Sequence, residues 1–352
     1  MLGDCCNTLQ NSQKTLFLLC SSWQHFITTI VAMSKSPLTV ASLTAQPGER
    51  ASTVLDLTFA DTPTKMPLFL LNGTHPGPTI VVTAGIHGAE YVGIAAALQV
   101  ARDMDPANLR GQLIIAPISS MTAFAKRAIY IAPPDNKNLN RCFPGKVDGS
   151  FAEQLAYWIF ENLIKRADAY LDLHGGDMNE ALVPFSIVQR SKDVALTEKA
   201  LALAAAFGIP LILAVDDAVK GGTFSAAADA GIPAVLAEIG GQGLWSTSEV
   251  QEMVHGLQRA LAHLGAIAPS APPAPQARVL EEMAWLRSDY DGLFYPACAV
   301  GDEVQAGQPL GQVTDYLGNT IQVVTAPVSG TVLFLVTTLA MNAGDPLLSV
   351  GA

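Results

Sequence analysis

The chain has 352 residues, of which 50% are hydrophobic and 14% are charged. This composition excludes a disordered or fibrous protein and provides enough apolar material for about two globular domains. Aspartate and glutamate outnumber lysine and arginine by 31 to 20, so the formal net charge is −11. Because the chain is acidic and has no run of lysine or arginine, we expect neither nucleic acid nor a membrane surface as a partner.

The cysteines and the N-terminal residues bear on where the protein is found in the cell. The five cysteines are scattered and form no CxxC pair, so we expect free thiols and a cytoplasmic protein. Residues 15–34 are uncharged but too polar for a good membrane span, and they lack the basic start of a signal peptide. We therefore expect residues 1–32 to be an upstream extension and Met33 to be the natural start; a targeting segment and an added helix are the alternatives.

From residue 38 onward the sequence alternates between strand and helix patterns. Residues 38–43 and 53–59 alternate in hydrophobicity like antiparallel strands. The alternation that follows predicts an α/β fold with a mixed, mainly parallel sheet flanked by helices. Short apolar runs predict buried strands at 79–84, 113–118, 169–174, 211–215 and 234–240. Helical periodicity lies between them, at about 90–104, 150–165, 193–207, 222–230 and 246–264.

The composition changes at residues 266–277, which are rich in alanine and proline. Such a segment forms a semi-extended linker and does not pack as a helix. Beyond it, short β-like runs are broken by glycine and proline, which predicts an all-β module. We expect a larger domain with the catalytic residues over 33–268, a linker over 269–277 and a β domain over 278–352.

Two strand ends carry residues suited to a metal. The segment TAGIHGAE (83–90) ends a buried strand and places His87 and Glu90 three residues apart. His174 ends the strand in LDLHGG (171–176), and open α/β sheets bind ligands at the carboxyl ends of their strands. Two histidines and a glutamate suit Zn²⁺ with an open position for catalysis. The alternative is a capped helix start with an incidental histidine.

A third strand end carries a candidate general base. In AVLAEIGGQG (234–243), Glu238 lies near the end of an otherwise apolar strand. A carboxylate there is costly to bury without a role or a partner. We expect it to transfer a proton between water and a leaving amine; the alternative is a strand-end glutamate paired with a lysine or arginine.

The polar segment NKNLNRCFPG (136–145) predicts a loop that binds an anion. Asn140 and Arg141 stand side by side in it. An arginine fork and an amide grip a carboxylate through several hydrogen bonds. A structural turn, in which Arg141 caps a helix, is the alternative.

Four motifs in this order resemble the succinylglutamate desuccinylase/aspartoacylase family, which has the zinc carboxypeptidase fold. They are HGAE, NLNRCFPG, LDLHGG and the glutamate of LAEIGG, and the resemblance covers roughly residues 40–350. Within the family the chain is similar to the N-acetyl-diaminobutyrate deacetylases of ectoine breakdown. The resemblance implies one zinc ion per chain and a small N-acyl amino acid as substrate. It implies zinc ligation by His87, Glu90 and His174, acid/base catalysis by Glu238, and a carboxylate clamp of Asn140 and Arg141.

The sequence departs from the family pattern upstream of the Asn-Arg pair. Members often have another arginine there, beside the developing oxyanion. We assign this role to Arg127 in AFAKRAIYIAPPD, although its spacing to Asn140 differs and Tyr130 stands at the expected place. Asn136 also replaces a typical glycine, so the loop conformation is expected to differ.

The last part of the chain resembles the barrel-sandwich fold of biotinyl and lipoyl carrier domains. GDEVQAGQPLG (301–311) and APVSGTVL (326–333) are the matching segments. Carrier domains need a modified lysine, and no lysine follows Lys220, so attachment of biotin or lipoate is excluded there. We expect the module to be structural, a lid or a contact in a homo-oligomer, because a fold alone supplies no function.

Three functions remain as hypotheses at this point. The leading one is a zinc-dependent amidohydrolase that removes an acetyl or succinyl group from an N-acyl amino acid. A metallocarboxypeptidase acting on peptide C-termini uses the same chemistry and is the nearest rival. A non-catalytic, zinc-stabilised binding protein is the third.

Overall fold

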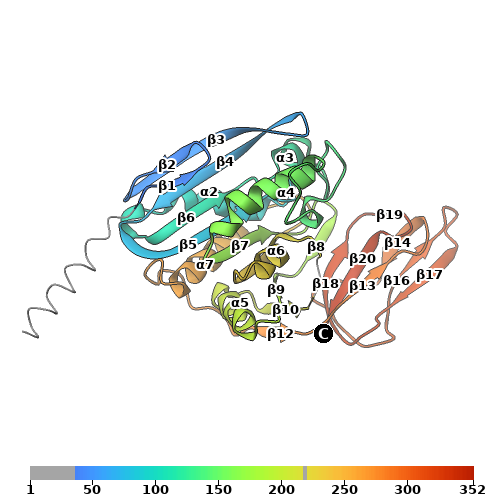
Figure 1. Cartoon of the computed structure of the whole chain (residues 1–352). Helices are drawn as coiled ribbons and strands as arrows, with labels where there is room; N and C mark the ends of the chain where they lie inside the picture. Colours follow the sequence, from blue (N-terminus) through green and yellow to red (C-terminus); the bar gives the residue numbers. More distant parts are fainter. Residues whose placement is uncertain (1–35, 217–219) are drawn as a thin grey trace, which may run out of the picture. The chain divides into compact units, whose positions relative to one another are not determined.

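A nine-stranded β-sheet forms the centre of the fold (Figure 1). The computed structural model describes residues 36–216 and 220–352. The sheet consists of β3 (Glu49–Phe59), β4 (Thr62–Asn72), β5 (His75–Ala84), β6 (Arg110–Ala116), β7 (Ala169–His174), β9 (Phe185–Gln189), β10 (Leu211–Val215), β11 (Ala234–Glu238) and β12 (Arg278–Leu280). In space they follow the order β12-β10-β9-β11-β7-β5-β6-β4-β3. Strands β6, β5, β7 and β11 run parallel, whereas β3, β4 and the β9–β11 pair are antiparallel, so the sheet is mixed.

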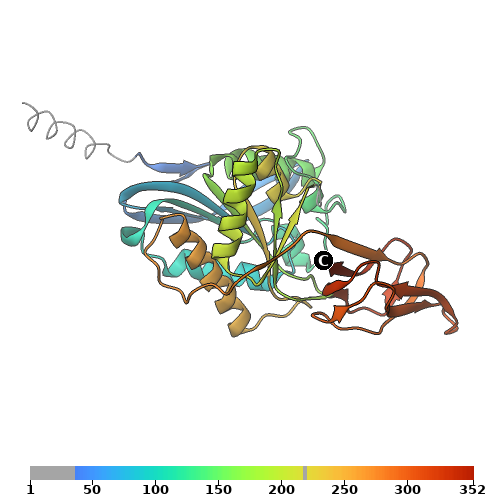
Figure 2. The ribbon, with the colours of Figure 1, turned by 90° about the horizontal axis from the view of Figure 1, so that it is seen from below.

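Helices cover both faces of this sheet (Figure 2). They are α2 (Tyr91–Asp103), α3 (Met121–Lys126), α4 (Phe151–Asn162), α5 (Val194–Phe207), α6 (Thr223–Asp229) and α7 (Thr247–His263). Successive side chains of a strand point to opposite faces. In β5, Ile80 and Val82 therefore pack in one core cluster with α2, α5 and α7, while Val81 packs in the other with α4 and α6. This arrangement confirms the predicted α/β fold.

The ends of the helices follow local signals in the sequence. Ser246 and Glu249 form a capping box that starts α7. Gly208 ends α5 in the left-handed conformation that favours glycine. The helices predicted at 193–207 and 246–264 accordingly begin and end within about one residue of the observed bounds.

The C-terminal β region consists of two antiparallel sheets (Figure 1). One has the order β13-β20-β18-β15 and the other β17-β16-β14-β19. Their bounds are β13 (Met283–Arg287), β14 (Gly292–Pro296), β15 (Glu303–Val304), β16 (Pro309–Thr314), β17 (Thr320–Thr325), β18 (Gly330–Val336), β19 (Ala340–Met341) and β20 (Pro346–Gly351). A shared apolar core includes Phe294, Leu310 and Leu348. The antiparallel character agrees with the predicted all-β module; its barrel-sandwich arrangement stays a prediction.

The two parts of the chain exchange strands at their boundary. We placed the start of the β domain at residue 278, but β12 pairs in parallel with β10 and extends the nine-stranded sheet. The antiparallel region therefore begins at β13. In the other direction, β8 (Glu180–Leu182) leaves the larger part and pairs with β18. Hydrogen bonding between strand edges, which a local sequence pattern does not encode, accounts for both additions.

Three remaining expectations concern the N-terminal extension, a membrane span and the cysteines. The extension predicted over residues 1–32 lies outside the described residues. Among residues 36–216 and 220–352, no helix combines the length and the apolar character needed to cross a membrane. Cys142 and Cys298 are free thiols, and both are half-buried.

Candidate active site

Three neighbouring parallel strands bring the predicted residues together at their carboxyl ends. His87 lies in the turn after β5, and Glu90 is the N-cap residue of α2. His174 is the last residue of β7, and Glu238 is the last residue of β11, directly opposite it in the register. Gly175 then allows the next loop to approach, because a Cβ atom there would lie 2.4 Å from the Ile239 carbonyl oxygen. The order of the strands thus explains why residues far apart in the sequence share one site.

His87, Glu90 and His174 form a compact cluster. One ligand atom from each lies within 4.8 Å of the others. Oε1 of Glu90 is 2.6 Å from Nδ1 of His87, and Oε2 is 2.8 Å from Nδ1 of His174. The two imidazole rings are nearly perpendicular, with centroids 5.1 Å apart. Both histidines therefore direct Nδ1 toward the same carboxylate, as two ligands of one ion do.

The electrostatics of this cluster favour a cation. Glu90 and His174 are buried, and His87 is only 11% exposed. Burial alone would raise the pKa of Glu90, but the charges and hydrogen bonds of His87 and His174 outweigh it and lower the pKa to about 2. An ionised buried carboxylate needs positive charge beside it. Two imidazole nitrogens and a carboxylate fit Zn²⁺, which supplies that charge.

Polar side chains orient both histidines. Nε2 of His174 lies 2.9 Å from Oδ2 of Asp172, a fully buried carboxylate that also accepts hydrogen bonds from the hydroxyls of Thr83 and Thr223. Nε2 of His87 lies 3.0 Å from Oδ1 of Asn138. Such partners fix the ring orientation and leave the other nitrogen for a metal. Sequence reasoning missed Asp172 and Asn138, although both belong to the quoted motifs.

Glu238 has a free oxygen beside the cluster. Its Oε2 atom is buried and has no hydrogen-bond partner in the described part of the chain. Burial raises the pKa of Glu238; His174 opposes this change, and the nearby carboxylates of Glu90 and Glu180 add to it. A buried acceptor without a partner is rare in folded proteins. The group is therefore available to take up and release a proton.

Asn140 and Arg141 lie in a short 3-10 turn, Leu139–Arg141, next to this site. Asn140 is buried, and its Oδ1 accepts a hydrogen bond of 2.9 Å from the backbone N–H of Thr223. Its amide nitrogen has no hydrogen-bond partner among the residues described. The Arg141 guanidinium donates to the Asn140 carbonyl at 2.7 Å and is close enough to Glu238 for the two charges to interact. Asn138 links this turn to the cluster, because its Oδ1 accepts from the backbone N–H of Asn140 and lies 3.0 Å from Nε2 of His87.

Arg127 is not part of this arrangement. It ends α3 in the left-handed conformation, and its exposed side chain lines a cleft with Tyr91, Phe124 and Trp245. Within residues 36–216 and 220–352, no hydrogen bond or ion pair joins that side chain to the histidines or glutamates of the cluster. Its assigned role beside the oxyanion stays a prediction without a contact to support it.

Tyr130, which we predict at the place of the family's additional arginine, lies beside His87. Its ring meets the ring of His87 edge-on, with centroids 6.4 Å apart. Its hydroxyl donates to Oε1 of Glu180 at 2.7 Å, and its backbone, with a φ of 60°, donates from N–H to Asp177. Burial raises the pKa of Glu180 to about 7. Tyr130 has a left-handed backbone conformation and is hydrogen-bonded through both its backbone and its hydroxyl. These constraints indicate that the loop is fixed against the site.

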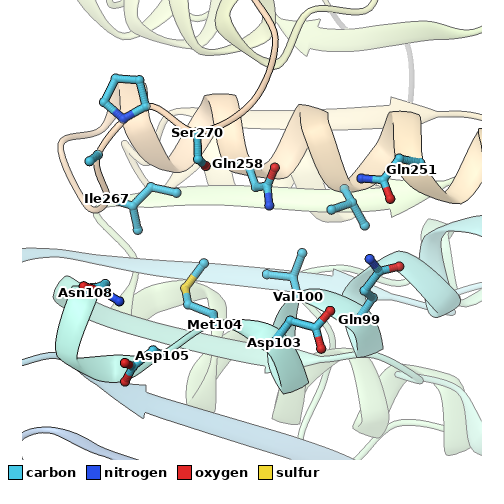
Figure 3. A pocket seen from close by; sticks show the side chains of 13 residues that line it. Gln99, Val100, Asp103, Met104, Asp105, Asn108, Gln251, Gln258, Ile267 and Ser270 are labelled. Carbon is cyan, nitrogen blue, oxygen red and sulfur yellow. The ribbon is translucent and has the colours of Figure 1, made fainter.

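The cavities of the structure differ in their relation to the cluster. One of about 630 Å³ is lined by Asn138 and Arg141 together with Lys137, Lys146 and Lys220. Another, of about 430 Å³, lies between the last turns of α2 and helix α7; Gln99, Asp103 and Gln258 line it (Figure 3). The second contains none of the candidate site residues. The first borders Asn138 and Arg141, and its lining also contains Glu153, which forms ion pairs with Lys137 and Lys146.

Comparisons with known proteins agree with this geometry. Residues 76–264 match the model of the succinylglutamate desuccinylase/aspartoacylase catalytic domain. N-alpha-acetyl-L-2,4-diaminobutyric acid deacetylase from Halomonas elongata is 30% identical over 244 residues, which are 68% of this chain and 71% of that protein. The product-bound ectoine utilization protein EutE from Ruegeria pomeroyi superposes with a TM-score of 0.79 and 26% identity, over 90% of this chain and 98% of the other.

A second solved structure extends this likeness. The succinylglutamate desuccinylase/aspartoacylase from Rhodobacter sphaeroides gives a TM-score of 0.77 with 26% identity, covering 86% of this chain and 94% of that chain. The family model spans more than half of the sequence, and the solved structures span the C-terminal β region as well. The resemblance inferred from four short motifs is confirmed: the chain belongs to the succinylglutamate desuccinylase/aspartoacylase family.

Proposed function

We propose that the protein is a zinc-dependent amidohydrolase that removes the acetyl group from an N-acetyl amino acid. One observation carries the proposal: two histidines and Glu90 converge at the strand ends, and the partner-free oxygen of Glu238 lies beside them. The relative from Halomonas elongata, named as a deacetylase, supports an acetyl rather than a succinyl group. Membership in the family supports hydrolysis of an amide.

Nδ1 of His87, Nδ1 of His174 and the Glu90 carboxylate would hold the metal. A zinc ion there supplies a Lewis acid for the amide carbonyl and makes water more acidic. Asp172 and Asn138 keep the two imidazoles in the orientation that this requires. The fit rests on the donor set and on the convergence of both Nδ1 atoms on one carboxylate.

The protein's own groups handle the proton and the substrate. Glu238 takes a proton from the attacking water on its free oxygen and delivers it to the nitrogen of the leaving amine as the C–N bond breaks. The amide nitrogen of Asn140 and the guanidinium of Arg141 bind the substrate carboxylate. Binding at this point holds the scissile amide near Glu238, which makes the reaction effectively unimolecular.

The proposal is tested with a panel of N-acetyl, N-succinyl and N-formyl amino acids, measuring amine release with and without a chelator. We expect chelator-sensitive turnover that is highest for the N-acetyl compounds. Faster release of C-terminal residues from short peptides would show that the protein is instead a metallocarboxypeptidase. Absence of turnover on both classes with zinc bound would contradict the hydrolase assignment.

A substitution at the proposed base separates binding from chemistry. Glu238→Gln keeps the shape of the side chain but cannot accept the proton, so kcat should fall about 10²- to 10⁴-fold. Zinc content should equal that of the parent. Glu198→Gln, an exposed position on α5, is the matched control. Full activity in the Glu238 variant would show that another group moves the proton.

A further inference from the structure

Thr223 is a buried residue that connects the candidate metal ligands with the candidate substrate clamp. It is the first residue of α6 and is fully buried. Its hydroxyl donates to Oδ2 of Asp172, the same oxygen that lies 2.9 Å from Nε2 of His174. Its backbone N–H donates to Oδ1 of Asn140 at 2.9 Å. Thr223 therefore contacts the partner of His174 with its side chain and Asn140 with its backbone.

The hydroxyl of Thr223 contributes to the hydrogen bonding of a buried carboxylate. Thr83 donates to Oδ1 of Asp172 at 2.6 Å, whereas Oδ2 faces the Thr223 hydroxyl and Nε2 of His174. A carboxylate is costly to bury unless such donors replace its water. Asp172 in turn holds Nε2 of His174 and leaves Nδ1 for a metal. The Thr223 hydroxyl thus supports the orientation of a proposed ligand from one residue further away.

The backbone N–H of Thr223 determines which end of the Asn140 amide is free. A backbone N–H can only donate, so it pairs with the oxygen of that amide and not with its NH2 group. At the start of a helix this N–H has no partner within the helix, and Asn140 supplies one. The NH2 group of Asn140 then keeps both of its donors for a ligand, and a carboxylate accepts such donors.

A second link joins Asn140 to the other histidine. Oδ1 of Asn138 lies 3.0 Å from Nε2 of His87 and accepts from the backbone N–H of Asn140 at 2.8 Å. The backbone of Asn140 is therefore fixed through Asn138, and its side chain is fixed through Thr223. Asn140 and Thr223 are at most 3% exposed, so water does not readily replace the bond between them.

We propose that Thr223 is a positioning residue for the hydrolysis, with separate roles for its two donors. Its hydroxyl orients His174 through Asp172, and its N–H turns the NH2 group of Asn140 toward the substrate carboxylate. This inference rests on the proposed function, because it takes zinc at His174 and a substrate carboxylate at Asn140 as given. Thr223 acts through these neighbours and needs no contact of its own with the metal or the substrate.

Three substitutions separate the two donors. Thr223→Ser keeps both, Thr223→Val keeps only the N–H, and Thr223→Pro removes both. Proline suits the first position of a helix, and Gly222 already has the extended conformation, with φ −75° and ψ 156°, that a residue before proline adopts. Thr247 holds the same position at the start of α7 and is exposed. Thr247→Val and Thr247→Pro are therefore matched controls.

Zinc affinity reports on the hydroxyl, and the preference for an acid over its carboxamide reports on the N–H. Thr223→Val should weaken zinc binding about 10-fold, as measured by competition with a chromophoric chelator. Its KM for the N-acetyl amino acid at saturating zinc should equal that of the parent. Thr223→Pro should also raise this KM about 10-fold, because the Asn140 amide can then turn its oxygen toward the carboxylate. The KM for the matching carboxamide, which offers both donors and an acceptor, should change little. Thr223→Ser and both Thr247 variants should match the parent.

The outcomes distinguish this inference from a structural role and from failure of the proposed function. Unchanged zinc affinity in Thr223→Val, or equal increases in KM for acid and carboxamide in Thr223→Pro, would overturn it. If Thr223→Pro does not fold, as judged by far-UV circular dichroism, Asn140→Asp takes its place. One oxygen of that aspartate still accepts from Thr223 and the other replaces the NH2 group, so KM should rise for the acid alone; an unchanged KM overturns the inference.

Activity of the parent tests the proposed function on its own. If the parent binds zinc but hydrolyses no N-acyl amino acid, the proposed function fails. Zinc affinity in Thr223→Val and calorimetric titration of Thr223→Pro with the acid and its carboxamide then decide the inference separately. A parent that binds no zinc overturns both.

Discussion

The strand ends of the central sheet and the C-terminal β region bury different kinds of side chain. At the strand ends, Asp172, His174 and Glu90 are at most 4% exposed. Among the described residues of the β region, none that carries a charge is buried. The buried polar residues there are Ser288, Thr314, Thr331 and Ser349. Because buried ionised groups destabilise a fold unless they are paired or bind a cation, the first region is organised for ligand chemistry and the second for packing. Next to the site, the pairing of β18 with β8 joins the second region to the loop after His174.

Removal of the metal should have the largest effect and should affect only the first region. We expect a chelator to abolish turnover, since the proposed chemistry depends on a Lewis acid at His87, Glu90 and His174. Restored Zn²⁺ should recover the activity. Metal content, amine release and far-UV circular dichroism are measured on one sample. Turnover that persists after the zinc content falls to the background level would contradict the proposed site.

A cavity in the core of the β region should affect stability far more than chemistry. Leu310 is fully buried in the apolar core of the two antiparallel sheets. Leu310→Ala should lower the free energy of unfolding by about 2–5 kcal/mol, as measured by denaturant titration. The kcat of the folded protein should change less than about twofold, because β16 holds no proposed site residue.

The control for this variant is Leu317→Ala. Leu317 is 89% exposed, so its removal should change the free energy of unfolding little. A large loss of kcat in Leu310→Ala at full folding would show that the core of the β region supports the site. The comparison between the two regions would then need revision.

A substitution at Asp172 tests how the imidazole of His174 is oriented, without removing a proposed metal ligand. Asp172→Asn loses the negative charge that holds the imidazole of His174, while its shape is nearly unchanged. Zinc affinity should fall about 10- to 100-fold, as measured by competition with a chromophoric chelator. Asp103→Asn, at an exposed position in the cavity of Figure 3, is the control and should bind zinc like the parent.

Much of this organisation could be predicted because it is local. Strands buried on both faces are continuous apolar runs, so 169–174 and 211–215 were predicted to the residue. The clustering of His87, Glu90 and His174 followed from their positions at strand ends. The role of each as a ligand remains a prediction.

The missed features depend on contacts between distant segments. Strand β8 has the sequence EAL, which has no strand pattern, and it forms because β18 offers a free edge. Asp172 was passed over because a lone acid in an apolar strand shows its function only once its contact with His174 is known. The contact of Tyr130 with His87 likewise depends on how the loop folds, and the role assigned to Arg127 from its position along the chain stays a prediction.

The smallest expected effect concerns Glu180, where the two regions meet. Its pKa is raised from 4.5 to about 7, mainly by burial. Between these values the folded state binds more protons than the unfolded state, so the free energy of unfolding falls as the pH rises from 4.5 to 7. Glu180→Gln cannot ionise and should remove this fall, which is on the order of 1 kcal/mol after solvent screening. Denaturant titrations at several pH values, on chelator-treated protein so that zinc does not lower the pKa, measure the slope. Glu198→Gln should keep the parental slope, and an unchanged slope in Glu180→Gln would show that the carboxyl at the junction titrates as it does in the unfolded chain.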